Sequence, residues 1–515
     1  MNFLQEIKLI QGGMGVYISN WRLAKAVAME KPGITAGTVS GTALDVVHVR
    51  LLQLGDPGGH LRRAFAAFDS LFGVDIGKKI CARYFIEGGK APGERFKYGP
   101  PQTARAKDGT RAFSKPTGDA ASITFTLEEE LMELLIACGF AEVWLAKEGH
   151  PGKIFINFLK KVELPLIFTM YGAMLAGVDG IVVGAGNPYG LPAIRSSLAE
   201  HAPVSHDISM LYSEMGETFH LSFDPREIAE GKLAQEPLKR PAFLAIVSLE
   251  NLVGALAQGP SEPPDGFIIE HHTAGGHNAA PQGPLKKDEL GQPVYSELDE
   301  PDLAAIRQEG LPFWLAGGYG SRDGLQRALQ AGAAGVQSGS IFALAEESGL
   351  SPAYRTAIFK ELRKGSSDAE LVQTSLFSPT GFPFKVAQLE GTLSEEEVYT
   401  DRRRLCDLGF LRQRGFNKPG ADGLRRVFQR CPAEPIEDYI SKRGMPFNTE
   451  GKRCLCNGLL ATVGLGQAGT QPGELSEEPA IITLGNHLDG VRKLSRQGQA
   501  VYYARTAVEE ILGEG

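Results

Sequence analysis

Short apolar runs that end at or near glycine recur through the first two thirds of the chain, and they constrain the fold more than any other feature. Runs that are apolar at nearly every position suit strands buried on both faces, as in a parallel sheet. Ten segments have this character: 8–10, 34–39, 80–85, 141–145, 154–158, 180–183, 242–247, 267–269, 313–315 and 336–337. A (β/α)8 barrel has eight strands, so we expect one or two of the ten to be false or to belong to an insertion.

Helical patterns lie between these runs. Thr126 to Glu129 has the form of a capping box for a helix whose leucines follow at helical spacing, and Gly139 is a plausible end for it. Ser321 can cap a second helix that ends near Gly332. Strand, glycine turn and helix in repetition predict an α/β fold, and more narrowly a TIM-type (β/α)8 barrel.

The repeating pattern also suggests how the chain is divided. We expect the barrel over residues 1–350, with polar, irregular insertions near 56–124 and 188–240 on its loop face. After about residue 350 the strand–glycine–helix pattern stops and charged segments follow. Residues 351–515 are therefore predicted to form a C-terminal extension with a small core of its own.

Composition excludes several classes of protein. With 43% hydrophobic and 22% charged residues the chain has globular proportions, and its net charge of −8 without a basic cluster argues against nucleic acid as a partner. The longest apolar stretch, 164–178, contains Pro165 and stops at Asp179, short of a membrane span. The N-terminus has no signal pattern, and six cysteines are too few for a disulfide framework. We therefore expect a cytoplasmic protein without a membrane partner.

Two glycine turns near the end of the predicted barrel suit a phosphate group. They are Trp314 to Ser321 and Gly335 to Ser340, where glycines let backbone N–H groups approach an anion beside a helix N-terminus. The last two βα loops of such barrels commonly bind phosphate, although ordinary tight turns would look the same. No GxxxxGK[ST] is present and Gly12 to Gly15 lacks GxGxxG spacing, so a mononucleotide phosphate is favoured over Walker or Rossmann sites.

Four motifs taken together resemble those of the nitronate monooxygenase (2-nitropropane dioxygenase-like) family. They are IQGGMG at 10–15, TAGGHN at 273–278, AGG at 316–318 and GVQSGS at 335–340. Their order and spacing match that family over about residues 5–345, which implies a (β/α)8 barrel that carries FMN. The same group includes flavin enoyl reductases of fatty-acid and polyketide synthesis. Residues 175–186, residues 378–383 and the C-terminal cysteines resemble a longer branch, similar to enoyl reductases of polyunsaturated fatty-acid synthases.

The resemblance implies the cofactor-binding positions of a flavoprotein. Gly12, Gly13 and Met14 would lie against the isoalloxazine. Gly275 and Gly276 would allow close approach to the flavin, and Gly318, Gly339 and Ser340 would hold the phosphate. The full set is Gly12, Gly13, Met14, Gly184, Gly275, Gly276, Gly317, Gly318, Gly339 and Ser340.

His277 is the candidate catalytic residue. An imidazole can accept an acidic proton near neutral pH, and His277 follows two glycines after a strand, on the face where barrels place their chemistry. In the family the histidine of this motif lies in the active site and is proposed as the base; without the motif a loop histidine is the simpler interpretation. Relatives usually have an apolar pair where this chain has His271 and His272, and strand alternation would point those two apart. His271, His272 and His277 could together suggest a metal site, but no carboxylate lies at a suitable spacing to complete it.

Four late cysteines form the candidate metal site. Cys406, Cys431, Cys454 and Cys456 lie within 51 residues, and four thiolates can hold zinc or an iron–sulfur cluster. One CxC and two single cysteines differ from the CxxC pairs of zinc ribbons, and buried structural thiols remain an alternative. Cys81 and Cys138 lie in apolar runs and suit that structural role.

Three functions follow as hypotheses. The first is an FMN-dependent oxidoreductase resembling nitronate monooxygenase, which oxidises an alkyl nitronate or similar acidic carbon substrate with O₂. The second is an NAD(P)H- and FMN-dependent enoyl-thioester reductase, whose acyl carrier would need a basic surface such as Arg402 to Arg404 or Arg425 to Arg426; a solvated charged face would look the same. The third, a non-catalytic barrel that only binds ligands, is disfavoured by the intact glycines and His277. Whether the chain forms a homodimer stays open.

Overall fold

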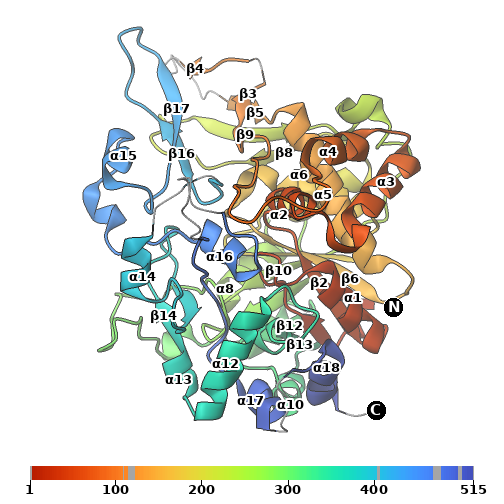
Figure 1. Cartoon of the computed structure of the whole chain (residues 1–515), viewed down its shortest axis with the longest axis vertical. Helices are drawn as coiled ribbons and strands as arrows, with labels where there is room; N and C mark the ends of the chain where they lie inside the picture. The colour runs from red at the N-terminus through yellow and green to blue at the C-terminus, as the bar shows by residue number, and fades with distance from the viewer. Residues whose placement is uncertain are drawn as a thin grey trace.

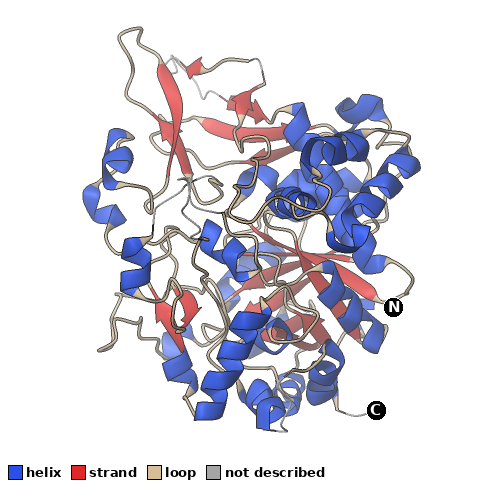
Figure 2. Cartoon of the chain, viewed as in Figure 1, coloured by secondary structure: helices blue, strands red, loops and turns tan. Residues whose placement is uncertain are grey.

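A closed barrel of eight parallel strands lies at the centre of the molecule (Figures 1 and 2). The computed structural model describes residues 3–107, 109–113, 122–402, 406, 408–467, 477–496 and 501–513. Neighbouring strands follow the order β1-β13-β12-β11-β10-β7-β6-β2, and every pair around the ring is parallel. The strands are β1 (Leu9–Gln11), β2 (Thr35–Ser40), β6 (Lys153–Leu159), β7 (Gly180–Gly184), β10 (Ala242–Val247), β11 (Gly266–Glu270), β12 (Phe313–Ala316) and β13 (Gly335–Ser338). The predicted (β/α)8 class is confirmed.

Helices surround the barrel and continue into the extension. Those up to the end of the barrel are α1 (Trp21–Glu30), α2 (Leu44–Gln53), α3 (His60–Phe72), α4 (Ile76–Tyr84), α5 (Glu129–Lys147), α6 (Glu163–Leu175), α7 (Leu191–Ala199), α8 (Glu250–Gln258), α9 (Leu303–Gln308), α10 (Arg322–Gln330) and α11 (Ser340–Ala343). Those of the extension are α12 (Pro352–Lys364), α13 (Asp368–Leu371), α14 (Glu396–Asp401), α15 (Ile436–Ser441), α16 (Cys456–Thr462), α17 (Asp489–Arg496) and α18 (Ala504–Leu512). Among the described residues, each helix is too short or too polar to cross a membrane.

Eight of the ten predicted strands are the barrel strands, and the other two predictions are wrong. Residues 80–85 lie mainly in α4, where Ile76, Ile80 and Tyr84 bury one helical face. Residues 141–145 lie inside α5, which is buried on nearly every side because it packs against α1, α3 and α6. A helix that is covered all round shows the same continuous apolar run as a doubly buried strand, so this segment could not be assigned from periodicity.

The predicted caps have mixed outcomes. Thr126 ends a short strand, and α5 begins at Glu129 without a side-chain cap, so the capping box is wrong. Gly139 does not end α5: a Cβ at this position would lie 2.3 Å from the Thr169 carbonyl oxygen of α6, so the glycine lets the two helices pack closely. Ser321 does cap α10, since its hydroxyl accepts the N–H of Gly324 at 3.2 Å.

The two predicted insertions are not irregular, because they contain helices and join in one sheet. The sheet order is β3-β5-β9-β8, and β5 from the first insertion pairs in parallel with β9 from the second (Figure 1). The first insertion also reaches the extension, where β4 completes a sheet with β16 and β17. These strands are β3 (Arg105–Ala106), β4 (Ala112–Phe113), β5 (Ser122–Thr126), β8 (Val204–Asp207), β9 (Thr218–Phe223), β16 (Gln413–Phe416) and β17 (Arg425–Arg430).

The C-terminal extension has a small apolar cluster and also wraps back onto the barrel. The cluster gathers around the hairpin of β14 (Val372–Ser375) and β15 (Phe384–Ala387) and includes Leu393, Tyr399 and Leu455. The final helix α18 packs against α1 and α10, so the two chain ends lie on the same side of the molecule (Figure 1). Residue 350 as a domain boundary stays a prediction.

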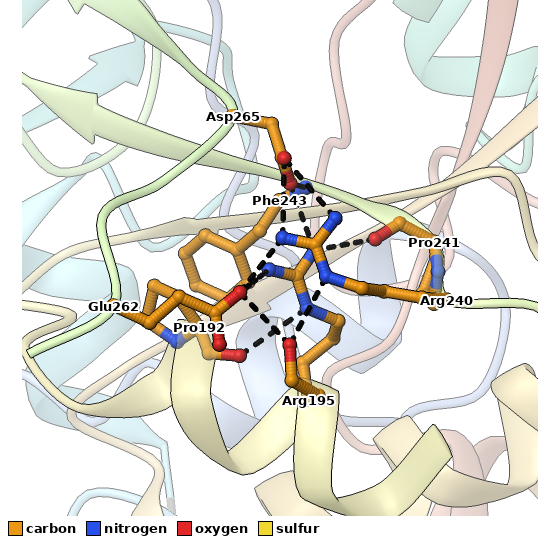
Figure 3. Close-up of polar contacts among 8 residues, drawn as sticks. Pro192, Arg195, Arg240, Pro241, Phe243, Glu262 and Asp265 are labelled. Carbon is orange, nitrogen blue, oxygen red and sulfur yellow. Dashed lines mark hydrogen bonds and ion pairs between the residues drawn. The ribbon is translucent and has the colours of Figure 1, made fainter. Parts of the chain in front are cut away.

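A buried arginine joins α7 to the segments that lead into β10 and β11, at the end of the barrel where strands begin (Figure 3). The Arg195 side chain has no solvent exposure and pairs with Glu262 at 2.9 Å and Asp265 at 2.8 Å. Its Nε also donates to the Pro192 carbonyl at 3.2 Å. Arg240 pairs with the same two carboxylates from a more exposed position.

Arg195→Met is expected to lower the free energy of unfolding by about 3–5 kcal/mol, because two carboxylates then remain partly buried without their main partner. Urea denaturation at neutral pH measures this change. Arg240→Met is the matched control and should cost about 0–1 kcal/mol, as exposed ion pairs do. Equal losses for the two variants would contradict a special role for the buried guanidinium.

Candidate active site

The main cavity, of about 240 Å³, opens where the barrel strands end. Loops after β1, β7, β11, β12 and β13 line it, together with parts of the C-terminal extension. All the predicted cofactor-binding residues and the predicted catalytic residue are brought together in its wall: Gly12, Gly13, Met14, Gly184, Gly275, Gly276, His277, Gly317, Gly318, Gly339 and Ser340. Residues separated by more than 300 positions in sequence therefore share one site.

Two glycines in this wall have a steric reason to be glycine. A Cβ on Gly13 would lie 2.1 Å from the Asn157 Cβ, so only glycine lets the loop after β1 pass this close to β6. Gly317 has φ of +87°, and a Cβ there would lie 2.8 Å from the Thr273 Oγ1. Both loops therefore present bare backbone to the cavity.

One side of the cavity is a cradle of backbone N–H groups. Within the described part of the chain, the N–H groups of Gly318, Gly339 and Ser340 donate no hydrogen bond. The imidazole of His487 is on the same side, with its Cγ 3.5 Å from the point where a Cβ of Gly318 would lie. Unpaired donors in the loop before α10 and at the start of α11, with an imidazole beside them, are suited to an anionic group.

The C-terminal extension closes over this cradle, which the motifs did not predict. The Thr483 Oγ1 accepts the Gly276 N–H at 2.6 Å, and the Gly485 N–H donates to the Ser340 Oγ at 2.8 Å. The Asn486 N–H donates to the Thr273 carbonyl at 3.2 Å. The sequence carried one signal of this segment: the apolar residues 480–482 are followed by Gly485, as in the barrel repeats.

His277 lies in the cavity wall between the barrel and the extension. Its Nε2 is 2.8 Å from the Ser378 Oγ. Its ring packs edge to face with Phe384, with the two ring centroids 4.7 Å apart. Burial lowers the pKa of His277 well below its usual value, and the positive charge of Lys161 lowers it further. The imidazole is therefore neutral at neutral pH, and it can accept a proton or a hydrogen bond. Ser378 begins the 378–383 motif noted in the sequence.

Two further titratable groups were not among the predicted site residues. Glu270 ends β11 and lines the cavity, and burial raises its pKa to about 7 while Lys161 opposes that shift. Burial lowers the pKa of Lys161 to about 8 while Glu270 opposes it. Both groups titrate near neutral pH, as is common at functional sites. The sequence did contain a signal for both residues. Glu270 is the last residue of β11 and Lys161 follows the end of β6, and side chains at this end of barrel strands reach the active site.

The expectation that His271 and His272 point apart is wrong. Strand β11 ends at Glu270, so alternation no longer applies, and the two rings lie 4.0 Å apart. The sequence near the two histidines has no carboxylate at a suitable spacing for a further metal ligand, but the fold brings one from Glu300. Its Oε1 is 2.9 Å from the His271 Nε2. His272 stacks on Tyr295 at 3.9 Å, and His277 is not part of this group.

The arginines proposed for a carrier-docking surface mostly pair with carboxylates instead. Arg402 and Arg425 are buried in ion pairs with Glu478 and Glu217, while Arg426 pairs at the surface with Asp422. Arg403 and Arg404 lie outside the described residues. A continuous basic docking face is therefore not formed by the described members of this set.

The four late cysteines are brought together around a second, smaller cavity. All four have free thiols; Cys431 is buried, Cys454 and Cys456 are partly buried, and Cys406 is exposed. Cys456 and its neighbour Leu455 line the main cavity as well, so the two cavities share a wall. Cys81 in α4 and Cys138 in α5 line neither cavity.

Comparison with known proteins supports the sequence motifs. Residues 234–378 match the sequence model of a family described as nitronate monooxygenase, which confirms the predicted resemblance for that segment. The segment contains the motifs at 273–278, 316–318 and 335–340. Among curated proteins no sequence match was found. The family match supports an oxidoreductase.

Solved structures with some similarity have low sequence identity. FabK from Thermotoga maritima is 14% identical with a TM-score of 0.43, covering 99% of this chain and 93% of that chain. Nitroalkane oxidase from Streptomyces ansochromogenes is 13% identical with a TM-score of 0.35, covering 75% and 79%. The enoyl reductase domain of MlnA from Bacillus amyloliquefaciens is 13% identical with a TM-score of 0.38, covering 73% and 82%.

Proposed function

We propose that this protein is an FMN-dependent oxidoreductase resembling nitronate monooxygenase, with FMN in the main cavity. The observation that carries the proposal is the convergence of glycine loops from β1, β11, β12 and β13 on one cavity. The residues fit this cofactor. The loop at Gly13 has no room for a Cβ and offers bare backbone to a flat ring, while the N–H groups of Gly318, Gly339 and Ser340 would hold the phosphate.

The other side of the cavity favours a substrate with an apolar chain. Side chains from the extension line it, and they include Phe410, Leu411, Leu455, Leu459 and Ile482. An alkyl nitronate, or a similar substrate with an acidic carbon, would place its chain here and its anionic head near His277 and Lys161. The neutral imidazole of His277 orients an anionic head, or takes the proton from a substrate that enters with its acidic carbon still protonated. FMN, when bound, supplies the capacity to accept electrons and to pass them to O₂.

The same apolar wall favours one alternative, an NAD(P)H- and FMN-dependent enoyl-thioester reductase. An acyl chain would occupy the space lined by Leu455, Leu459 and Leu460. In that reaction His277 would hold the thioester carbonyl by a hydrogen bond rather than accept a proton.

Visible spectroscopy of the purified protein tests the proposal. A flavin spectrum, with FMN identified after release, is expected. Under anaerobic conditions, bleaching by an alkyl nitronate but not by NAD(P)H supports the first reaction, and bleaching by NAD(P)H supports the reductase. A colourless protein that does not regain a flavin spectrum after incubation with FMN would contradict both.

The Glu270–Lys161 pair makes a pH prediction for an anionic substrate. As pH rises, Glu270 gains a negative charge near pH 7 and Lys161 loses its positive charge near pH 8. Both steps make the cavity more negative, so KM for preformed nitronate should rise between pH 6 and 9. We expect roughly a tenfold rise, equivalent to about 1.4 kcal/mol at partly buried charges.

Glu270→Gln tests this origin. The variant should bind nitronate more tightly at pH 8 and keep only one step, moved below pH 8 because Lys161 loses its carboxylate neighbour. Glu300→Gln, which alters a more exposed carboxylate beside His271, is the matched control and should keep the wild-type profile. If the pH dependence of KM were unchanged in Glu270→Gln, the Glu270–Lys161 pair would be ruled out as the cause of that dependence.

A further inference from the structure

The second cavity carries an inference that does not depend on the flavin. Its wall combines four thiols from three separate segments: Cys406, Cys431 after β17, and Cys454 with Cys456 at the start of α16. The remaining wall is largely apolar and includes Leu408, Leu411, Leu455 and Pro379. Four of the six cysteines of the chain therefore line one small space.

Polar groups lie beside all four sulfurs. The backbone N–H groups of Ala433, Asn457 and Leu411 lie next to the sulfurs of Cys431, Cys454 and Cys456, respectively. The Arg412 guanidinium donates to the Cys406 sulfur at 3.3 Å. Donors aimed at sulfur stabilise thiolate ligands and are a recurring feature of iron–sulfur sites, where they tune the potential.

The spacing of the thiols favours a cluster over a single ion. Four thiolates bound at 2.3 Å to one tetrahedral zinc would lie about 3.8 Å from one another. Within the described part of the chain, the group that brings three potential ligand atoms within 4.8 Å is His271, His272 and Glu300, so no three of these sulfurs meet that limit. A wider arrangement of thiols around an apolar cavity suits a cluster with several iron ions. Cys431 is also followed by Pro432, a pairing found in bacterial cluster motifs.

We propose that Cys406, Cys431, Cys454 and Cys456 hold a [4Fe–4S] cluster beside the main cavity. Four iron–thiolate bonds form and the four thiols release their protons. Two ferrous and two ferric ions with four sulfides give a core of charge +2, so assembly needs no additional oxidant. Cys456 and Leu455 lie in both cavity walls, so the cluster adjoins the side of the main cavity proposed for the substrate chain.

Anaerobic reconstitution of the full chain tests the proposal. Purified protein is incubated with equal amounts of ferrous and ferric iron and with sulfide, then desalted. We expect four iron and four acid-labile sulfide per chain, and an electron paramagnetic resonance signal after dithionite reduction. One zinc per chain without sulfide, or no retained metal, would overturn the proposal.

Variants connect the cluster to these thiols. Cys406→Ser changes the exposed ligand, where folding is least affected, and the double variant Cys454→Ser/Cys456→Ser removes two ligands; each should lose at least tenfold of the bound iron and sulfide. Cys81→Ser in α4 is the control and should keep them. Full iron content in the double variant would overturn the assignment. Flavin content is measured in the same samples, so iron without flavin would overturn only the proposed function, and flavin without iron only the cluster.

Discussion

His277→Ala is expected to lower turnover about 10²- to 10⁴-fold while the flavin stays bound, the loss that follows removal of a positioned acid–base group. His277 lines the cavity, but the proposed cofactor contacts come from glycine backbones and Ser340. Its Nε2 faces the Ser378 hydroxyl at 2.8 Å, so alanine removes both the proton acceptor and the end of that polar contact. Turnover of nitronate and the flavin absorbance per chain measure the two effects separately.

His220→Ala is the matched control for this variant. His220 lies on β9 in the outer sheet, pairs with Asp207 at 2.7 Å, and does not line the cavity. It should retain wild-type turnover. Ser378→Ala should give a smaller loss than His277→Ala, because it removes only the partner that orients the imidazole. Wild-type turnover in His277→Ala would remove this residue from the reaction.

Gly13→Ala is expected to weaken FMN binding at least about 100-fold. The added Cβ would lie 2.1 Å from the Asn157 Cβ, so the loop after β1 must shift by more than an ångström. A displacement of about 1 Å in positioning groups can cost 10²-fold, because the contacts no longer meet the ligand. Fluorescence titration of cofactor-free protein with FMN gives the dissociation constants.

Gly254→Ala controls for a general effect of replacing glycine. Gly254 lies in α8, away from the cavity, and its Cβ would meet the Glu309 Oε1 at 3.4 Å. Because alanine is the better helix former, we expect wild-type FMN affinity and unchanged or slightly higher stability. Circular dichroism of Gly13→Ala distinguishes lost binding from lost folding. Wild-type affinity in a folded Gly13→Ala protein would remove this loop from the cofactor site.

The barrel could be predicted from the sequence because its strands are covered on both faces and leave a simple apolar signature. The same signature misled at residues 141–145, since α5 is also covered on nearly every side. What distinguishes the two is the length of the surrounding helix and the packing of Gly139 against α6, and these depend on neighbours distant in sequence. A continuous apolar run correctly indicates a segment buried on all sides, but it does not distinguish a buried helix from a buried strand.

The glycine loops of the site were predictable because their motifs are local and resemble a known family. Thr483, by contrast, meets Gly276 across 207 positions of sequence, and no local pattern specifies that contact. Glu270 and Lys161 lie on different strand ends, so their coupled pKa values arise only when the barrel closes. The four cysteines were identified as a group, but only the fold shows that they surround one cavity beside the first.

The hydrogen bonds from Thr483 and Gly485 to the barrel loops have a consequence for the order of assembly. Both residues follow β13, the last barrel strand, in the sequence, so the ribosome makes all eight barrel strands before it makes the segment that closes the cavity. A ligand can enter most easily in that interval. Afterwards the segment with Thr483 and Gly485 covers the cavity and holds the ligand in place, and this segment is here called the latch. Escape of a trapped ligand then depends on how often the latch releases, so retention through purification reflects an opening rate as well as an affinity.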